Sequence, residues 1–303
     1  MQYPKLFTNF LLDRLKILEG KINIVIDTDT YNEIDDQFAL AYALKSDDRL
    51  IIEAIYAAPF SNKIIDNPSE GMLKSYEEIQ RVLNVLNLKK EVLVFKGSTH
   101  YLTDIETPCM SEAVEDIVKR AMNAKEPLYA VALGAITNIA SAILLEPKII
   151  EKIVIIWMGG NSLYWNDAKD FNLMQDVIGA RILFDSGVPI IHIPALNVTS
   201  HLLASVFEIE YYLNNKNPIG TYLTKIFRDH QFQNSRLSKE LWDIAAIAFL
   251  LNSSWVPTNI VHSPILTDQL TWSIDSSRHF MKTAISVDRD AIFQDMYKRI
   301  TDK

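Results

Sequence analysis

Short apolar segments alternate with segments of helical periodicity over the first 200 residues, and this alternation constrains the fold most. Six apolar segments have the length and continuous apolar character of strands buried on both faces, as in a parallel sheet: Ile22–Ile26, Leu50–Ala57, Val92–Phe95, Leu128–Leu133, Ile153–Met158 and Pro189–Pro194. The segments between them have helical periodicity: Asp36–Lys45, Ser69–Leu86, Ser111–Asn123, Thr137–Leu145 and Gln175–Ser186. Such alternation is typical of β-α-β units with right-handed crossovers. We therefore expect an α/β fold with a mainly parallel central sheet flanked by helices.

The last third of the chain is mostly helical, with two strand-like segments and a final helix after Asp288: Ser200–Asn214, Gly220–Asp229 and Lys239–Leu251 as helices, Ile265–Ile274 and Phe280–Val287 as strands. No repeat or Pro/Gly/Ser-rich linker divides the chain. We therefore expect one domain over residues 1–303, with a helical insertion in its C-terminal third. Residues 1–20 form an N-terminal helical extension, in which Leu6–Leu18 has the pattern of an amphipathic helix that packs on the domain or on a neighbouring subunit.

Charge and composition exclude several classes of partner. The net charge of −8 disfavours phosphate backbones and anionic lipids, so we expect no nucleic acid and no membrane partner. The longest unbroken apolar run, Ile244–Leu251, is far shorter than the ~20 residues that span a bilayer. The one cysteine, Cys109, cannot form an internal disulfide. We expect a soluble, cytoplasmic protein.

The ten residues from 27 to 36, at the end of the first predicted strand, contain five carboxylates and no Lys or Arg: Asp27, Asp29, Glu33, Asp35 and Asp36. Carboxylates this close raise one another's pKa unless a positive charge lies among them. A hard divalent cation with oxygen ligands, Ca²⁺ or Mg²⁺, is the simplest compensation. A helix dipole would favour Asp35 and Asp36 but would not explain Asp27 and Asp29, which lie on the strand side. The loop therefore predicts a metal site.

Polar residues follow other predicted strands, at the sheet edge where parallel α/β folds bind ligands: Asn62, Thr137, Gly159-Gly160, Asp170, Asn172 and, later, Trp242-Asp243. Each has an ordinary explanation when taken alone. Thr137 could cap a helix, Asn62 and Asn172 could be turn residues, and Asp243 could lie in the first turn of a helix. Their joint placement at one edge indicates a binding site.

The same segments resemble, in order, the signature of the calcium-dependent nucleoside hydrolases. Residues 27–36 resemble the Asp-x-Asp-Pro-Gly-x-Asp-Asp loop of that family, lengthened by two residues and without Pro-Gly. Five further segments match its motifs: 133–140 (Gly-Pro-Leu-Thr-Asn-x-Ala), 157–160 (Met-Gly-Gly), 170–172 (Glu-Phe-Asn), 176–180 (Asp-Pro-Glu-Ala-Ala) and 242–243 (His-Asp or Trp-Asp). The resemblance covers about residues 22–290. It implies an open, Rossmann-like core and an enzyme that hydrolyses ribonucleosides to free base and ribose.

The resemblance also implies roles for individual residues. Ca²⁺ would be held by Asp29, Asp36, Asp243 and the backbone carbonyl of Thr137. Asp29 would also act as the general base toward a water that attacks the ribose. The ribose hydroxyls would be bound by four residues: Asp35, Asn62, Asp170 and Asn172. Asp27 would orient the loop from behind the ligands, and Glu33 would add a ligand, shift the cation or narrow the ribose pocket.

Trp242 bears on the substrate. One branch of the family has a histidine here as leaving-group acid, whereas the purine-specific branch has a tryptophan that stacks on the base. The resemblance therefore favours purine ribosides, although core packing is the ordinary role of such a tryptophan. Phe227, His230 and Phe232 are further possible base contacts. The family is often dimeric or tetrameric, so a homo-oligomer is expected.

Two other interpretations remain open. Asp27-Thr28-Asp29-Thr30 approaches the nucleophile motif of haloacid-dehalogenase-type phosphatases, in which Asp27 would attack phosphorus. The threonine of that motif would fall on Tyr31, and the second acidic pair that such enzymes need is not found. A non-catalytic relative that binds ribosides is the other alternative, because a shared fold does not guarantee a shared activity.

Overall fold

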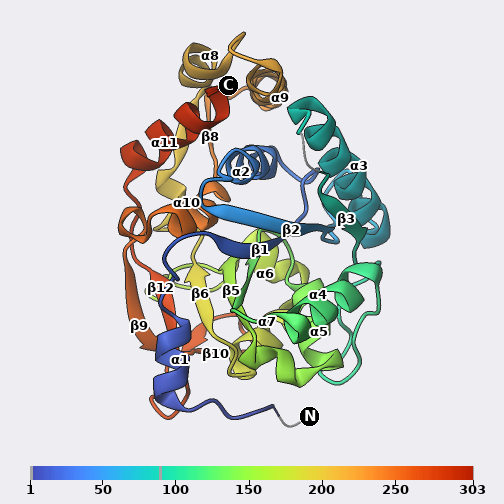
Figure 1. Ribbon diagram of the computed structural model, residues 1–303, viewed down its shortest axis with the longest axis vertical. Helices are drawn as coiled ribbons and strands as arrows, with labels where there is room; N and C mark the ends of the chain where they lie inside the picture. The colour runs from blue at the N-terminus through green and yellow to red at the C-terminus, as the bar shows by residue number, and fades with distance from the viewer. Residues whose placement is uncertain (1–2, 89–90, 303) are drawn as a thin grey trace.

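An eight-stranded sheet crosses the molecule, and helices cover both of its faces (Figure 1). The computed structural model describes residues 3–88 and 91–302. The strand order is β3-β2-β1-β4-β5-β6-β12-β9, and every neighbouring pair is parallel except β12 with β9. The bounds are β1 Ile22–Thr28, β2 Leu50–Ala57, β3 Leu93–Lys96, β4 Leu128–Ala132, β5 Ile153–Met158, β6 Ile190–Ile193, β9 Thr258–His262 and β12 Phe280–Ala284. This is the mainly parallel α/β fold that the sequence predicts.

Each face of the sheet has its own hydrophobic cluster. Along β1, Ile24 and Ile26 belong to one cluster, whereas Val25 belongs to the other, because successive side chains of a strand point to opposite faces. The helices of the first face are α2 (Asp35–Leu44), α3 (Pro68–Leu86), α10 (Ile244–Leu251) and α11 (Arg289–Thr301). Those of the second are α4 (Glu112–Asn123), α5 (Thr137–Leu145) and α7 (Val177–Asp185). Burial on both faces explains why the central strands are continuously apolar.

The strand order reverses between β1 and β4. From β1 the chain continues to β2 and β3 on one side, and the later strands β4, β5 and β6 extend the other side. Ligands of open α/β sheets bind beyond the carboxyl ends of the strands at such a switch point. Asp27 pairs with Ala132 in register, so the loop after β1 lies beside the loop after β4.

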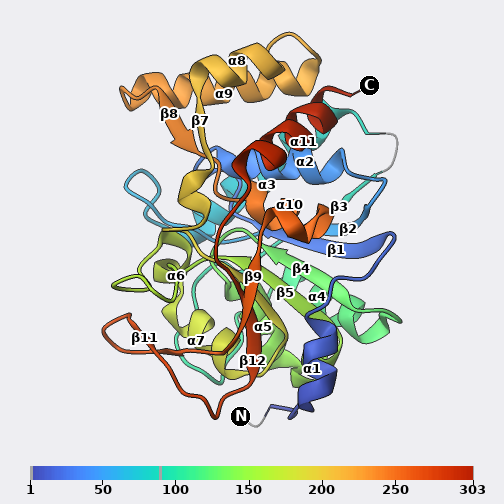
Figure 2. The ribbon, with the colours of Figure 1, turned by 90° about the vertical axis from the view of Figure 1, so that its left-hand side faces the viewer.

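The predicted helical insertion is a pair of helices, α8 (Val206–Leu213) and α9 (Pro218–Gln233), at one end of the molecule (Figures 1 and 2). Two short antiparallel strands, β7 (Leu203–Ser205) and β8 (Ser238–Glu240), join it to the rest of the chain. The prediction of one unbroken helix over 200–214 is therefore wrong, because a 3-10 turn, η2 (Thr199–His201), and β7 precede α8.

Three other predicted boundaries differ. The helix expected over 239–251 begins only at Ile244, as α10, because residues 238–240 form β8. The helix expected over 175–186 begins at Val177, as α7, because Asp176 leaves helical conformation and accepts a hydrogen bond from the Gly179 amide. A separate short helix, α6 (Phe171–Gln175), precedes it. The strand expected over 265–274 is a hairpin of β10 (Ile265–Leu266) and β11 (Trp272–Ser273), with Leu270 at positive φ in the turn. The edge strand β9 was not predicted. Two short 3-10 turns complete the elements, η1 (Pro147–Glu151) and η3 (Ser253–Trp255).

The N-terminal helix α1 covers Thr8–Arg14, shorter than predicted. Leu11 and Leu15 are buried, whereas Phe7 is exposed, so the helix packs on the domain through part of its apolar face. Residues 1 and 2 of the predicted extension lie outside the described residues. The division into one domain with an N-terminal extension stays a prediction.

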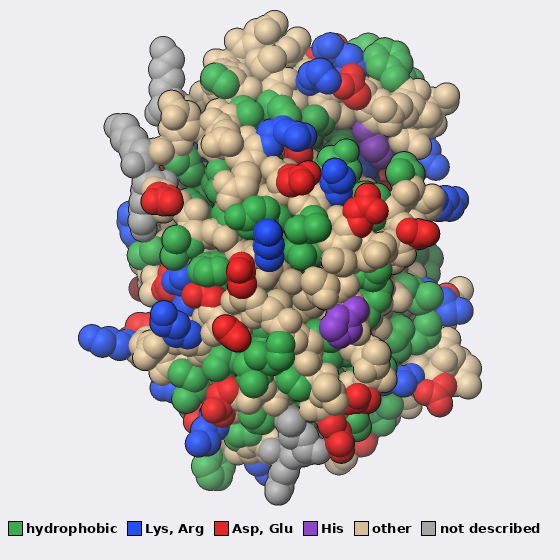
Figure 3. Space-filling view, turned by 90° about the vertical axis from the view of Figure 1, so that its right-hand side faces the viewer, with side chains coloured by type: hydrophobic (Ala, Val, Ile, Leu, Met, Phe, Trp, Pro, Cys, Tyr) green, Lys and Arg blue, Asp and Glu red, His purple; other side chains and the backbone are tan. Residues whose placement is uncertain are grey.

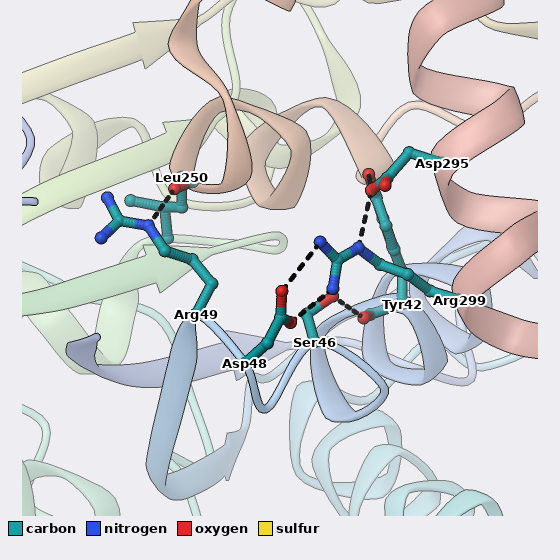
Figure 4. A network of polar contacts seen from close by, with 7 residues as sticks. All are labelled: Tyr42, Ser46, Asp48, Arg49, Leu250, Asp295 and Arg299. Carbon is teal, nitrogen blue, oxygen red and sulfur yellow. Dashed lines mark hydrogen bonds and ion pairs between the residues drawn. The ribbon is translucent and has the colours of Figure 1, made fainter. Parts of the chain in front are cut away.

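A polar network holds the end of α2 that points away from the loop after β1 (Figure 4). The Tyr42 hydroxyl donates to Asp295 of α11 at 2.6 Å, and the Ser46 hydroxyl donates to the Tyr42 carbonyl at 2.7 Å. Arg299 donates to both Asp295, at 2.8 Å, and Asp48, at 2.5 Å. These contacts fix α2 against α11.

The surface view in Figure 3 shows acidic and basic side chains interspersed on one face, with no continuous patch of either sign. Within residues 3–88 and 91–302, no helix combines the length and apolar character that crossing a membrane requires.

Candidate active site

Four buried carboxylates come from three places in the chain to the end of β1. Asp29 directly follows β1, Asp35 and Asp36 begin α2, and Asp243 directly precedes α10, which packs against α2. Each of the four is at most 3% exposed. Oxygen atoms of Asp35, Asp36 and Asp243 lie within 4.8 Å of one another. The fold therefore joins the loop after β1 to an aspartate some 200 residues later.

Two oxygen atoms of this cluster have no hydrogen-bond partner among the described residues, Oδ2 of Asp29 and Oδ1 of Asp243. Asp243 occupies the N-cap position of α10, but it has helical backbone angles and its side chain makes no capping hydrogen bond. Its expected ordinary role at a helix start therefore does not account for it. A buried carboxylate oxygen without a partner is costly, and an oxygen-only donor set with several carboxylates suits a hard divalent cation. The residues present fit such a cation.

Burial is the main cause of raised pKa values in the cluster. The pKa of Asp36 rises to about 7 through burial and then through the charge of Asp35, although a hydrogen bond from Thr28 opposes the rise. The pKa of Asp35 rises to about 6 through burial, while Lys239 lowers it. Burial and neighbouring carboxylates raise the pKa of Asp29 and of Asp243 well above the ordinary range. The protein therefore does not fully compensate the negative charge of these carboxylates.

A lysine that the sequence analysis missed supplies part of that charge. Lys239 of β8 lies 2.5 Å from the Glu33 carboxylate, and its side chain is only 8% exposed. Glu33 belongs to the lengthened loop between β1 and α2. Its carboxylate is therefore bound to an ammonium group rather than left free beside the acidic cluster.

The acidic cluster forms one wall of a cavity of about 870 Å³. Nine of the predicted site residues line this cavity: Asp29, Glu33, Asp35, Asp36, Asn62, Asp170, Asn172, Trp242 and Asp243. Asp27 and Thr137 are not among its lining residues. Trp242 is half-buried and also packs against the core, so its position is compatible with both stacking and packing.

The residues predicted to bind ribose are held by backbone contacts. Asp170 caps α6 and accepts hydrogen bonds from the Gly160, Asn172 and Leu173 amides. The Asn172 side-chain amide donates to the carbonyls of Leu133 and Met158, at 2.8 and 2.9 Å, and so links the ends of β4 and β5. These contacts hold both side chains in place at the cavity.

Asn62 plays the turn role that the sequence left open, because its side-chain oxygen accepts hydrogen bonds from the amides of Ile64 and Ile65, each at 2.9 Å. Its side-chain nitrogen donates to Asn32 of the acidic loop at 3.1 Å. Asn62 thus lines the cavity and contacts the loop at the same time.

Asp27 lies behind the loop. It is 1% exposed, and its Oδ1 accepts a hydrogen bond of 2.7 Å from Asn138. The same Asn138 amide donates to Ala57 of β2, and its oxygen accepts from the Ser98 amide after β3, so Asn138 ties three strand ends together. Asp27 does not line the cavity, so this geometry gives no support to the phosphatase interpretation, in which Asp27 would attack phosphorus.

Thr137 begins α5 and is fully buried. Its hydroxyl donates to Asp176 at 2.7 Å, which ties α5 to the start of α7. The side chain is therefore occupied away from the cavity. The predicted cation ligand is the Thr137 backbone carbonyl, and that role stays a prediction.

Residues of α3 and α9 also line the cavity; the sequence analysis predicted both helices but, apart from His230, named none of these residues for the site. Glu78 and Arg81 of α3 and Tyr222 of α9 line the cavity, with the Glu78 carboxylate bonded to both of the others. His230 lines the cavity, and its contact with a base stays a prediction. The expectation for Phe227 and Phe232 is wrong: Phe227 is buried against Phe38, and Phe232 is exposed outside the cavity.

The chain is similar to proteins of one known family. The sequence profile of the inosine-uridine preferring nucleoside hydrolases matches residues 24–294. The chain belongs to this family. The resemblance seen in the sequence is thus confirmed, and this nucleoside hydrolase is an enzyme that cleaves N-ribosyl bonds.

Two similar relatives of the hydrolase are both named pyrimidine-specific ribonucleoside hydrolase RihA. The protein from Enterobacter sp. (strain 638) is 28% identical over 227 residues, which are 67% of this chain and 69% of that protein. The protein from Salmonella typhi is 27% identical over 261 residues, 75% of this chain and 79% of that protein.

Solved structures show the same fold. A purine-preferring ribonucleoside hydrolase from Gardnerella vaginalis has a TM-score of 0.75 at 22% identity and covers 92% of this hydrolase and 98% of its own chain. A plant nucleoside hydrolase has a TM-score of 0.75 at 18% identity, covering 93% and 99%. An inosine-guanosine nucleoside hydrolase has a TM-score of 0.76 at 19% identity, covering 92% and 98%.

Proposed function

We propose that this enzyme hydrolyses the N-glycosidic bond of purine ribonucleosides and requires Ca²⁺. One observation carries the proposal: buried carboxylates with unpartnered oxygen atoms line the same cavity as Trp242. The carboxylates can bind a cation and accept a proton. The indole can stack on a nucleobase with a large flat face.

The cation would be held by Asp29, Asp36 and Asp243, with the Thr137 carbonyl completing the protein ligands. Asp35 adds a further carboxylate oxygen close to those of Asp36 and Asp243. A bound Ca²⁺ supplies Lewis acidity toward water. The oxygen-only character of the set favours Ca²⁺ over softer transition metals.

Asp29 would take the proton of the attacking water. Its Oδ2 has no partner in the protein and its side chain lines the cavity, as a general base requires. Oxygen from the water bonds to C1′ of the ribose as the bond from C1′ to the base nitrogen breaks, and the electron pair leaves with the base. The buried carboxylates favour the positive charge that develops on the ribose.

The ribose would lie against Asp35, Asn62, Asp170 and Asn172, all of which line the cavity. Asp170 and Asn172 are held by backbone contacts, so little conformational freedom is lost when they bind hydroxyl groups. Asp27 would orient the loop through Asn138.

Pyrimidine ribosides are the second candidate substrate, because the RihA relatives are named pyrimidine-specific. The purine preference instead rests on Trp242 as a stacking surface, which a purine covers more fully than a pyrimidine. Both candidate substrates would use the same cation and the same general base, Asp29. They differ only in the part of the cavity that would hold the leaving nucleobase.

Release of free base from inosine, adenosine, guanosine, uridine and cytidine tests the proposal. We expect purine ribosides to react faster, and Trp242→Ala to lower kcat on them about tenfold. The matched control is Trp255→Ala, because Trp255 is half-buried but does not line the cavity. Faster turnover of uridine and cytidine would replace the purine assignment, and no turnover of any riboside would indicate a binding protein.

A further inference from the structure

The acidic loop forms one ion pair among the described residues, and that pair is Glu33 with Lys239. The 2.5 Å contact joins the loop between β1 and α2 to β8, which is 206 positions later in the chain. The Lys239 side chain is 8% exposed, whereas that of Glu33 is 45% exposed. A lysine so deeply buried loses much of its hydration and needs negative charge nearby. Glu33 and Asp35 provide that charge.

Lys239 reaches the loop from outside the cavity. Glu33 and Asp35 line the cavity, but Lys239 does not. The backbone of Lys239 is fixed, because β8 pairs with β7 and the Leu241 amide donates to the Leu202 carbonyl at 2.9 Å. The ammonium group is therefore held against Glu33, in a loop whose next carboxylates, Asp35 and Asp36, belong to the acidic cluster.

An ammonium group cannot ligate a cation, and it repels one. It stabilises the carboxylates when no cation is bound and opposes the cation when it arrives. We propose that Lys239 is a built-in counter-charge that keeps the acidic loop assembled in the cation-free enzyme and thereby weakens its affinity for Ca²⁺. Lys239 is thus a positioning residue, and the inference rests on the cation site of the proposed function.

A simple loop anchor predicts the opposite sign. If Lys239 served only to hold the ligands in place, its loss would misplace them and weaken Ca²⁺ binding. If it is a counter-charge, its loss destabilises the cation-free form more than the loaded form, so binding tightens. The sign of the change in affinity therefore separates the two roles.

The test is calorimetric titration of Ca²⁺ into chelator-treated enzyme, combined with thermal unfolding of the chelated and the loaded forms. We expect Lys239→Met to bind Ca²⁺ at least about threefold more tightly. We also expect it to lower the Tm of the chelated enzyme by about 1 °C more than that of the loaded enzyme for each threefold gain in affinity. Lys239→Arg keeps the charge and should restore wild-type values. Glu33→Gln leaves the ammonium unpaired and should weaken Ca²⁺ binding.

The matched control is Arg120→Met, because Arg120 also pairs across elements, with Glu53 of β2 and with Asp116 of α4, and its side chain is 19% exposed. Its loss should lower both Tm values equally and leave the affinity unchanged. If Lys239→Met does not fold without Ca²⁺, Lys239→Gln is titrated with the same expectation. Weaker or unchanged binding in the neutral variants would overturn the inference. If the wild type binds no Ca²⁺, the cation site itself is wrong.

Discussion

At the scale of single residues, the buried carboxylates lower the stability of the cation-free fold, and they form the proposed cation site. Asp36 and its neighbours are forced together by the start of α2 and the end of β1, and no hydrogen-bond donor of the described residues reaches Oδ2 of Asp29 or Oδ1 of Asp243. Buried ionisable groups whose pKa is strongly shifted are typical of functional sites. Removing one of their charges should therefore help folding and harm function.

We expect Asp36→Asn to weaken Ca²⁺ binding at least about 100-fold and to abolish turnover, because a ligand charge is lost. The chelated variant should unfold at a higher temperature than the chelated wild type, because a buried like charge has been removed. Calorimetry and thermal unfolding measure the two effects. Asp47→Asn is the control, since Asp47 is exposed beyond α2. Lower stability together with normal binding would show that Asp36 is structural.

Some of these residues could be found in the sequence and others could not. Asp29, Asp35 and Asp36 lie in one short loop after an apolar strand, so their density is a local signal. Asp243 could be placed only through its match to a motif. Lys239 carries no local signal, because only the fold brings its ammonium group to Glu33.

At the scale of elements, α2 connects the site to the rest of the molecule. Its first turn carries Asp35 and Asp36, and its last turn is bound through Tyr42 to α11 (Figure 4). The first turn of α2 contributes to the site, whereas the last turn only anchors the helix to α11. A change at the last turn should therefore leave the site intact.

We expect Arg299→Ala to lower the free energy of unfolding by about 1–2 kcal/mol, because it removes hydrogen bonds to Asp295 and Asp48 from a partly exposed network. Ca²⁺ affinity and kcat should stay within twofold of the wild type. Urea unfolding and calcium titration provide the measurements. A large loss of Ca²⁺ affinity would mean that α2 transmits strain to its first turn.

Element prediction succeeded where burial makes strands continuously apolar, as in β2 and β5, whose bounds were predicted as observed. It failed at β9, because this edge strand is half-exposed and has no continuous apolar run. It also failed over 265–274, where a turn interrupts an apolar segment. These failures lie in the last third of the chain, away from the core strands that position the acidic loop.

At the scale of the whole molecule, the switch point of the sheet lies at the acidic loop, and the cavity there is lined by the carboxylates and by residues of α3 and α9. A homo-oligomer stays a prediction. The raised pKa values of the cluster couple this site to the stability of the entire fold.

We expect the stabilisation by a fixed concentration of Ca²⁺ to grow as the pH rises from 5 to 8. The pKa of Asp35 is raised to about 6 and that of Asp36 to about 7, so the cation-free native state holds protons that the unfolded state releases. Each such aspartate contributes stability that is complete below pH 4 and is lost as the pH rises through its native pKa. Bound Ca²⁺ displaces these protons and offsets the loss. The measurement is the difference in unfolding free energy between loaded and chelated enzyme. Buried His192 and His279 titrate in both forms and cancel in this difference. A gain independent of pH would contradict the proposed site.

The central claim is that one divalent cation among Asp29, Asp36 and Asp243 makes the cavity catalytic. The most direct measurement adds Ca²⁺ stepwise to chelator-treated enzyme and follows both binding and the release of base from inosine. The account predicts no turnover before addition, and activity that rises in proportion to occupancy and saturates at one Ca²⁺ per chain. Full turnover in the chelated enzyme, or binding of Ca²⁺ that leaves activity unchanged, would contradict it.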